Sequence, residues 1–397
     1  MERVVKGCGI VAIAVMLSSC QTFDLDRGYG IIDYGSDNSE LLKQKMQRLL
    51  TEKNSVISIV QFGDAHTSTG YFTETLRNLM QQRFGDAGIG WITPVGITEQ
   101  KDITVKRSAY QWDIISSRTT VQADFPMGGY IATPKRNGAE IKVVLNSAKR
   151  DKGLWDIRLM VKGKTTVPIS IIDSKGRADL TYSMMNLAPN QWRVMNAVTT
   201  MPFSIKADNQ VELGGLWLQK HDQAGVIVSA IGMKEAQLIS WNQWSPQWLS
   251  ELQTTHSDLV ILEYGTNEAL DANLDEKEYR QNLVSSIKRI RRQLPNAVML
   301  LMSPPDLMVK GKTQGACIEQ VPISYEKVKT TQMAVANAEG LLYWDWQKAM
   351  GGSCNIAKWY TEGLADKDLI HLTPLGYEIS AEMLYKSLLK HWQITTN

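Results

Sequence analysis

The chain has 397 residues, of which 43% are hydrophobic and 21% are charged, ordinary values for a globular protein with a buried core. Its length favours two domains, and a formal net charge of +2 argues against a nucleic-acid-binding protein. The five histidines are scattered and no CxxC motif is present, so we expect no metal site and no cofactor.

The N-terminus has the pattern of a lipoprotein signal. Arg3 and Lys6 precede an apolar run that ends at Leu17. A run of about ten residues suits a signal-peptide core and is too short to span a bilayer, which needs about twenty. The letters LSSC resemble the bacterial lipobox, and this resemblance implies cleavage after residue 19 and acylation of Cys20. Because Gln21 rather than Asp follows, we expect a periplasmic protein anchored to the outer membrane; the alternative is an ordinary secretory signal.

Lipidation also determines how the four cysteines are interpreted. Cys8 would be removed by the cleavage, and Cys20, the last residue of the predicted signal segment (residues 1–20), would stay and carry the lipid. Cys317 and Cys354 then form an even pair in an oxidising compartment, where disulfides persist. A disulfide between them is one interpretation, and two reduced buried thiols are the other.

The next segments predict the beginning of an α/β domain. Residues 21–37 are polar and are expected to form a tether. Within residues 38–92, apolar residues at helical spacing predict a helix over 39–53 that begins at a serine able to cap it. The stretch SVISIV then predicts a buried strand over 55–60, and a second helix is predicted over 72–84.

The middle of the chain has a different texture. Over residues 93–220, short β-type stretches alternate with turn signals such as DSKG, which predicts an inserted β-sandwich or jelly roll. Residues 221–397 return to strands alternating with helices, the pattern of a parallel sheet covered on both faces. The sequence thus predicts a three-layer α/β domain interrupted by an all-β domain. Tryptophans of the insert, Trp112, Trp155 and Trp192 among them, are interpreted either as core residues or as platforms for sugar rings.

Four short segments carry residues suited to catalysis. They are GDAHT with Ala65, AIGMKEA with Gly232, YGTNEA with Asn267, and DLIHLTPLGY with Asp368 and His371. Three of them follow predicted strands, so they should gather at the carboxyl edge of a parallel sheet, where open α/β folds place their ligand sites. Each segment alone is a weak indication; the four together, in this order, are a strong one.

That order resembles the SGNH, or GDSL, hydrolase superfamily, which is named for a Ser, a Gly, an Asn and a His in four blocks. Further stretches, among them FGDAHT followed by YFT, FPMGGY and EYGTNEA, look like those of the periplasmic peptidoglycan O-acetylesterases. In that group a β domain resembling a carbohydrate-binding module is inserted into the esterase domain. The resemblance implies O-acetylated peptidoglycan strands as partner, and removal of the acetyl group from C6 of N-acetylmuramic acid.

The resemblance also implies the role of each residue. His371 would be the general base and Asp368 the carboxylate that orients it, as in other serine hydrolases. The oxyanion hole would use the backbone N–H of residue 65, the backbone N–H of Gly232 and the side-chain amide of Asn267. Loss of one such donor costs roughly 3 kcal/mol of transition-state stabilisation.

Ala65 departs from the family at the nucleophile. Its methyl group cannot attack a carbonyl, and Thr67 and Ser68 are expected about 200° and 300° further around the helix. Loss of the serine nucleophile typically lowers kcat by about 10⁶-fold, so we expect an inactive or strongly impaired enzyme. Two alternatives stay open: a pseudo-esterase that binds acetylated glycan, or an SGNH acetylesterase that acts on another polysaccharide.

Overall fold

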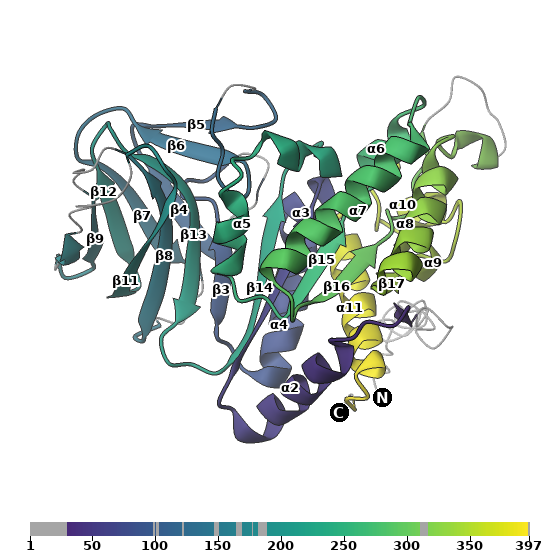
Figure 1. Cartoon of the computed structure of the whole chain (residues 1–397), viewed down its shortest axis with the longest axis horizontal. Coiled ribbons are helices and arrows are strands. Elements are labelled where there is room, and N and C mark those ends of the chain that lie inside the picture. Colours follow the sequence, from purple (N-terminus) through teal and green to yellow (C-terminus); the bar gives the residue numbers. More distant parts are fainter. Residues whose placement is uncertain are drawn as a thin grey trace, which may run out of the picture.

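The computed structural model describes most of the chain. The described residues are 30–97, 100, 103–120, 123–146, 151–163, 169–176, 178–181, 189–309 and 317–395. The predicted signal peptide and Cys20 therefore lie outside them. Figure 1 shows a sheet flanked by helices on one side of the molecule and β sheets on the other.

The sheet of the α/β part has the strand order β1–β17–β16–β15–β2–β14, and all neighbours are parallel except β1 and β17. The strands are β1 (Ile32–Asp33), β2 (Val56–Gly63), β14 (Gly225–Gly232), β15 (Leu259–Glu263), β16 (Val298–Met302) and β17 (Leu342–Trp344). Successive side chains point to opposite faces of a strand. Leu259 and Ile261 thus enter one buried cluster while Val260 and Leu262 enter another, so both faces of the sheet are covered.

Two layers of helices bury these faces. The first cluster draws apolar side chains from α2 (Ser39–Glu52), α4 (Tyr71–Phe84), α9 (Trp346–Ala349), α10 (Ile356–Thr361) and α11 (Pro374–His391). The second draws them from η1 (Leu238–Gln243), α5 (Trp248–Gln253), α7 (Glu276–Gln293) and α8 (Tyr325–Glu339). The short elements α3 (Ala65–Ser68), α6 (Thr266–Leu270) and η2 (Cys317–Gln320) complete this domain. The predicted three-layer arrangement is confirmed.

The insert forms a sandwich of two antiparallel sheets around its own core, so the predicted all-β insert is confirmed as well. One sheet has the order β10–β9–β12–β7–β4, and the other has the order β11–β8–β13–β6–β5, with β3 paired to β13. Their bounds are β3 (Gly88–Ile92), β4 (Val105–Ala109), β5 (Trp112–Ser116), β6 (Tyr130–Pro134), β7 (Ala139–Leu145), β8 (Leu154–Lys162), β9 (Ile169–Asp173), β10 (Ala178–Thr181), β11 (Arg193–Thr200), β12 (Phe203–Ala207) and β13 (Glu212–Lys220). Trp91 and Met127 of this region share a buried cluster with Trp241 and Trp248, so the two domains pack directly on each other.

Two local expectations differ from the structure. The predicted tether (residues 21–37) contains β1, where Ile32 pairs with Tyr343 and extends the sheet. The first helix begins at Ser39, and its N-cap residue is Asn38, whose side chain makes no capping hydrogen bond. Ser39 does not cap it, because its hydroxyl lies 2.9 Å from Nε2 of His391 and joins α2 to the end of α11 instead.

Candidate active site

The carboxyl ends of three parallel strands bring three of the predicted segments together. Gly63, at the end of β2, is paired with Gly232 at the end of β14 and with Glu263 at the end of β15. The chain then turns from β2 into α3, which begins at Ala65, and from β15 into α6, which carries Asn267. Positions 65, 232 and 267 therefore meet at one edge of the sheet, where an open α/β fold binds its ligands.

The turn into α3 exposes a backbone donor at position 65. Asp64 is the N-cap, and its Oδ1 accepts the backbone N–H of His66 at 2.9 Å. Ala65 is half-buried and is the first residue of the helix. No carbonyl within α3 can accept its N–H, because the first N–H groups of a helix have no intrahelical partner.

Gly232 lies where the loop after β14 passes α3. A β-carbon added at Gly232 would lie 2.5 Å from the nitrogen and 2.8 Å from the α-carbon of Ser68. Just beyond it, the N–H of Met233 donates to the carbonyl of Gly63 at 3.2 Å. The close approach of the two backbones requires glycine here and places the second proposed donor beside the first.

Asn267 is half-buried in the first turn of α6. Its Nδ2 donates to the carbonyl of Ala236 at 2.9 Å. A side-chain amide has two N–H donors, so one fixes the plane of the amide and the other is left for a ligand. The third proposed oxyanion donor is thus oriented by the same loop that carries Gly232.

Asp368 and His371 form the expected pair on the turn before α11. Oδ2 of Asp368 lies 2.7 Å from Nδ1 of His371, and Oδ1 accepts the backbone N–H groups of Ile370 and His371, both at 3.0 Å. Partial burial opposes ionisation of Asp368, but these hydrogen bonds outweigh it and lower the pKa of the carboxyl. An ionised carboxylate at Nδ1 keeps the proton there and leaves Nε2 as the basic atom.

His66 connects this pair to the nucleophile position. Its ring centroid lies 5.5 Å from that of His371, and its Nδ1 lies 2.9 Å from the hydroxyl of Tyr377. Burial, with His371 nearby, lowers the pKa of His66 to about 3, so the ring is neutral. Because His66 directly follows Ala65, the fourth segment reaches the same edge of the sheet as the other three.

Three buried carboxyl groups beneath these loops were not anticipated from the sequence. Burial raises the pKa of Asp64 to about 7 and that of Glu268 to about 7, and burial next to Asp64 raises the pKa of Glu263 well above its usual range. The sequence signal for Glu263 is a charged residue that closes an otherwise apolar strand. Its partner, Thr67, comes from a different segment, and no local pattern predicts that contact.

The hydroxyl groups nearest to Ala65 are bound elsewhere. Thr67 Oγ1 donates to Glu263 at 2.8 Å and accepts from Gln61 at 2.8 Å, in a fully buried network. Ser68 is buried and donates to the carbonyl of Ala65 at 3.2 Å. Neither side chain takes the place of the missing serine hydroxyl.

The tryptophans of the insert are mostly core residues. Trp155 is 1% exposed, and Trp192 and Trp217 are 5% exposed. These rings are covered by protein and cannot stack on a sugar, so the platform interpretation is wrong for Trp155 and Trp192. Trp112 is half-buried at the start of β5.

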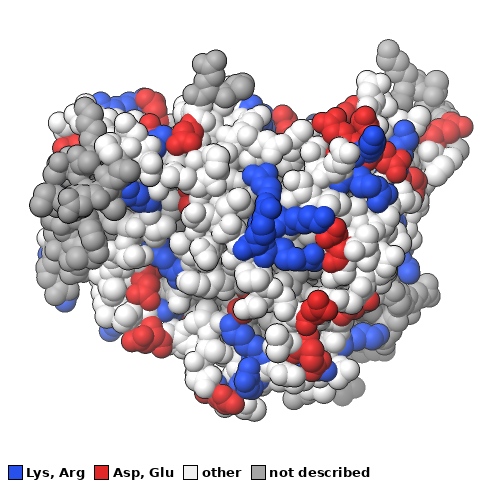
Figure 2. All heavy atoms as spheres, viewed as in Figure 1, with Lys and Arg blue, Asp and Glu red and all other residues white. Residues whose placement is uncertain are grey.

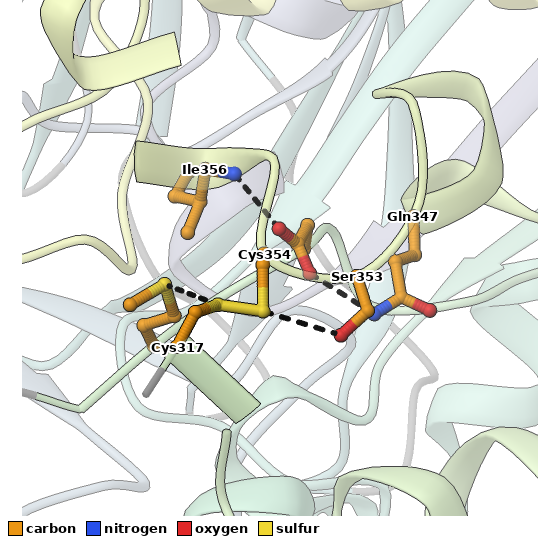
Figure 3. The surroundings of a disulfide bond; sticks show 7 residues. Cys317, Gln347, Ser353, Cys354 and Ile356 are labelled. Atoms are coloured by element: carbon orange, nitrogen blue, oxygen red, sulfur yellow. Dashed lines mark hydrogen bonds between the residues drawn. A yellow bond between two sulfur atoms is a disulfide. The ribbon is translucent and has the colours of Figure 1, made fainter. Parts of the chain in front are cut away.

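Cys317 and Cys354 are joined by a disulfide with a Cα–Cα distance of 5.9 Å. Figure 3 shows it linking η2 to the turn before α10, and Sγ of Cys317 lies 3.6 Å from Sδ of Met308. The backbone N–H of Met308 donates to the carbonyl of Leu369 at 2.9 Å. A single residue, Met308, thus connects the disulfide to the turn that holds the Asp368–His371 pair.

No group of three or more His, Cys, Asp or Glu side chains in the described part of the chain could hold a metal ion. Among the same residues, no helix is long and apolar enough to cross a membrane.

Figure 2 shows Lys and Arg side chains gathered over the middle of one face, where α7 lies in Figure 1. On that helix Arg291 pairs with Glu339 at 3.2 Å, and Arg289 lies over the ring of Trp248.

Comparison with known proteins agrees with this geometry. Residues 87–204 match the family model for the N-terminal part of peptidoglycan O-acetylesterases, and residues 210–379 match that of the GDSL-like lipase/acylhydrolase family. The chain is similar to a solved structure described as a peptidoglycan O-acetylesterase in action, with 28% identity, a TM-score of 0.82, and coverage of 92% of this chain and 99% of that one.

More distant similarities involve an acetyl xylan esterase and a family two carbohydrate esterase from Cellvibrio japonicus. The first has 16% identity and a TM-score of 0.32, and the match covers 40% of this chain and 79% of that one. The second has 11% identity and a TM-score of 0.30, and the match covers 73% of this chain and 99% of that one. No curated protein sequence matches the chain.

Proposed function

We propose that this chain, which belongs to the SGNH (GDSL-like) hydrolase superfamily, has the scaffold of an esterase that removes the acetyl group from C6 of N-acetylmuramic acid in peptidoglycan. The observation that carries the proposal is the meeting of Ala65, Gly232 and Asn267 at one sheet edge, with the Asp368–His371 pair beside them. The similarity to a peptidoglycan O-acetylesterase over 92% of the chain supports the substrate class.

The chemistry on this scaffold is acyl transfer. With a serine at position 65, His371 would take the hydroxyl proton as the oxygen attacks the acetyl carbonyl, and Asp368 would stabilise the resulting imidazolium. Donors from residue 65, Gly232 and Asn267 would bind the negative charge that develops on the carbonyl oxygen. Ala65 supplies the backbone donor but no nucleophile, so we expect the chain to be inactive or strongly impaired as an esterase.

The absence of a nucleophile at Ala65 favours a second function, which is binding of acetylated glycan without turnover. The hydroxyl groups of Thr67 and Ser68 are held in other hydrogen bonds, while the proposed oxyanion donors and the Asp368–His371 pair are present. Such a site would recognise the acetyl group and release the glycan unchanged. An acetylesterase for a different polysaccharide, such as alginate or a capsule, is the third reading.

The location follows from the substrate. Peptidoglycan lies outside the cytoplasm, and the lipobox-like LSSC would attach the protein to a membrane through acylated Cys20. We propose a periplasmic protein with a lipid anchor in the outer membrane. Labelling with a radioactive fatty acid should mark the parent and leave Cys20→Ala unlabelled.

The decisive experiment restores the nucleophile. Ala65→Ser should release acetate from an aryl acetate and from O-acetylated peptidoglycan at least about 10⁴-fold faster than the parent. Ala65→Ser/His371→Ala is the matched control and should return the rate to that of the parent.

Two other results of this experiment would favour the glycan-binding function or an esterase for another polysaccharide. If the serine variant stays inactive while the parent still sediments with O-acetylated but not with de-O-acetylated peptidoglycan, the chain is a binding protein. If the serine variant prefers acetylated alginate or xylan, the substrate proposal is wrong and the third reading holds.

A further inference from the structure

The two parts of the proposed oxyanion hole are fastened to each other by consecutive residues of α6. Asn267 Nδ2 donates to the carbonyl of Ala236 at 2.9 Å, and Oε1 of Glu268 accepts the backbone N–H of Leu238 at 2.9 Å. Both acceptor and donor belong to the loop that begins at Gly232. The side chain that would bind the oxyanion and the loop that carries the second donor are therefore held in one relative position.

Glu268 lies in surroundings that would otherwise disfavour a glutamate. It is 4% exposed, and no cation of the described residues pairs with it; Asp64 and Glu263 lie on the side of the sheet, and Tyr279 on the side of α7. A buried carboxyl without a cation is costly unless it is hydrogen-bonded. Its hydrogen bond to Leu238 satisfies the first N–H of η1, which has no partner within that helix.

The hydrogen bond between Glu268 and Leu238 helps to fix the loop that carries Gly232. Leu238 is the point at which the loop from Gly232 enters η1, and Asn267 fixes the same loop two residues earlier, at Ala236. Without Glu268, the hydrogen bonds of the described residues would join the loop to α6 through the Asn267 amide alone, and that amide is itself a proposed oxyanion donor. The hydrogen bond of Glu268 therefore gives the loop a second attachment to α6, in addition to that of Asn267.

We propose that Glu268 is a positioning residue, which holds the 232–238 loop against α6 so that the Gly232 N–H and the Asn267 amide converge on one carbonyl oxygen. This inference rests on the function proposed above. Burial raises the pKa of Glu268 to about 7, so a neutral glutamine, which keeps an oxygen acceptor for Leu238, is the conservative replacement.

The first test needs no catalytic activity and uses the parent chain. Glu268→Ala should speed hydrogen–deuterium exchange of the 232–238 segment at least about tenfold, while exchange within β14 stays as in the parent and Glu268→Gln remains close to it. Unchanged exchange in the 232–238 segment of the alanine variant would overturn the proposal, whatever the enzyme does.

The second test uses the Ala65→Ser background. Glu268→Ala should lower kcat by about 10–100-fold, somewhat less than outright loss of one oxyanion donor, with KM changed less than about threefold; Glu268→Gln should restore most of kcat. Glu251→Ala is the matched control, because Glu251 is another buried glutamate that accepts a backbone N–H, that of Met127 at 2.6 Å, away from the site. It should lower stability and leave kcat within about threefold.

The outcomes are distinguishable. Equal losses of kcat in Glu268→Ala and Glu251→Ala would reduce Glu268 to a structural residue and overturn the inference. An inactive Ala65→Ser enzyme would refute the proposed function, and the exchange experiment alone would then decide the role of Glu268.

Discussion

Thr67 donates its hydroxyl to the buried carboxyl of Glu263 at 2.8 Å, which ties α3 to the end of the neighbouring strand β15. The same oxygen accepts from Gln61 Nε2 at 2.8 Å, so its O–H donor and one of its two acceptor sites are engaged in the buried network. The nearest threonine to the nucleophile position therefore fixes the turn that presents residue 65. Its role is structural, and it does not substitute for the serine.

Replacing Thr67 tests that role. Thr67→Val keeps the shape of the side chain but removes the hydrogen bonds that Thr67 makes to Gln61 Nε2 and Glu263 Oε2, so the free energy of unfolding should fall by about 1–3 kcal/mol. Thr67→Ser should stay close to the parent because it keeps the hydroxyl. Urea unfolding measures the difference. A valine variant that is as stable as the parent but loses all residual esterase activity would instead identify Thr67 as a nucleophile.

The Asp368–His371 pair has a prediction of its own, made in the Ala65→Ser background. Asp368→Asn should lower kcat by about 10⁴-fold, because an amide no longer holds the His371 proton at Nδ1. Asp366→Asn, an exposed carboxylate earlier in the same turn, is the control and should keep kcat. Equal activity of the two variants would show that Asp368 does not orient the histidine.

The sequence predicted the elements and loops of the site because those signals are local. A strand ending in glycine, or an Asp three residues before a His, can be recognised without knowing the rest of the fold. The roles of Glu263 and Glu268 could not be predicted in this way. Each bonds to a residue from another segment, Thr67 and Leu238 respectively. The pairing of β2 with β15 brings Thr67 to Glu263, and the further pairing of β14 with β2 brings the segment of Leu238 to the same edge of the sheet as Glu268.

The insert shows the same limit. Alternating apolar residues correctly indicated a β-sandwich, but they could not tell a core tryptophan from a surface one. Trp155 lies in the buried cluster formed by residues of both sheets, and Nζ of Lys220 lies 5.7 Å from the centroid of its ring. Which side of a strand faces the second sheet depends on long-range packing.

Removing the Cys317–Cys354 bond should lower stability. The cysteines are 37 residues apart, and closing a loop of this length in the unfolded chain stabilises the fold by about 4 kcal/mol in the chain-entropy model. The double Cys317→Ser/Cys354→Ser variant should therefore unfold at lower urea than the oxidised parent. A reductant should lower the parent to the level of the variant and leave the variant unchanged. If the reductant destabilises both proteins equally, the disulfide does not account for the difference.

The buried carboxyl of Glu251 predicts how stability depends on pH. Glu251 is 3% exposed, its Oε2 accepts the N–H of Met127 from the insert at 2.6 Å, and burial raises its pKa to about 8. Between the unfolded pKa, about 4.5, and the folded one, the folded state holds a proton that the unfolded state has lost. Stability contributed by this group is therefore complete below the lower pKa and falls as the pH rises, by about 1.4 kcal/mol per pH unit.

Glu251→Gln removes this titration and keeps an oxygen for Met127. Asp64 and Glu268 also have raised pKa values and contribute slopes of the same sign, but they are present in both proteins. The difference in unfolding free energy, variant minus parent, should hence be smallest near pH 5 and grow by several kcal/mol toward pH 8. Urea titrations at pH 5, 6, 7 and 8 measure it. Parallel curves for the two proteins would mean that Glu251 is already ionised in the folded state, in which case its contact with Met127 is a charged hydrogen bond that is stable across this range.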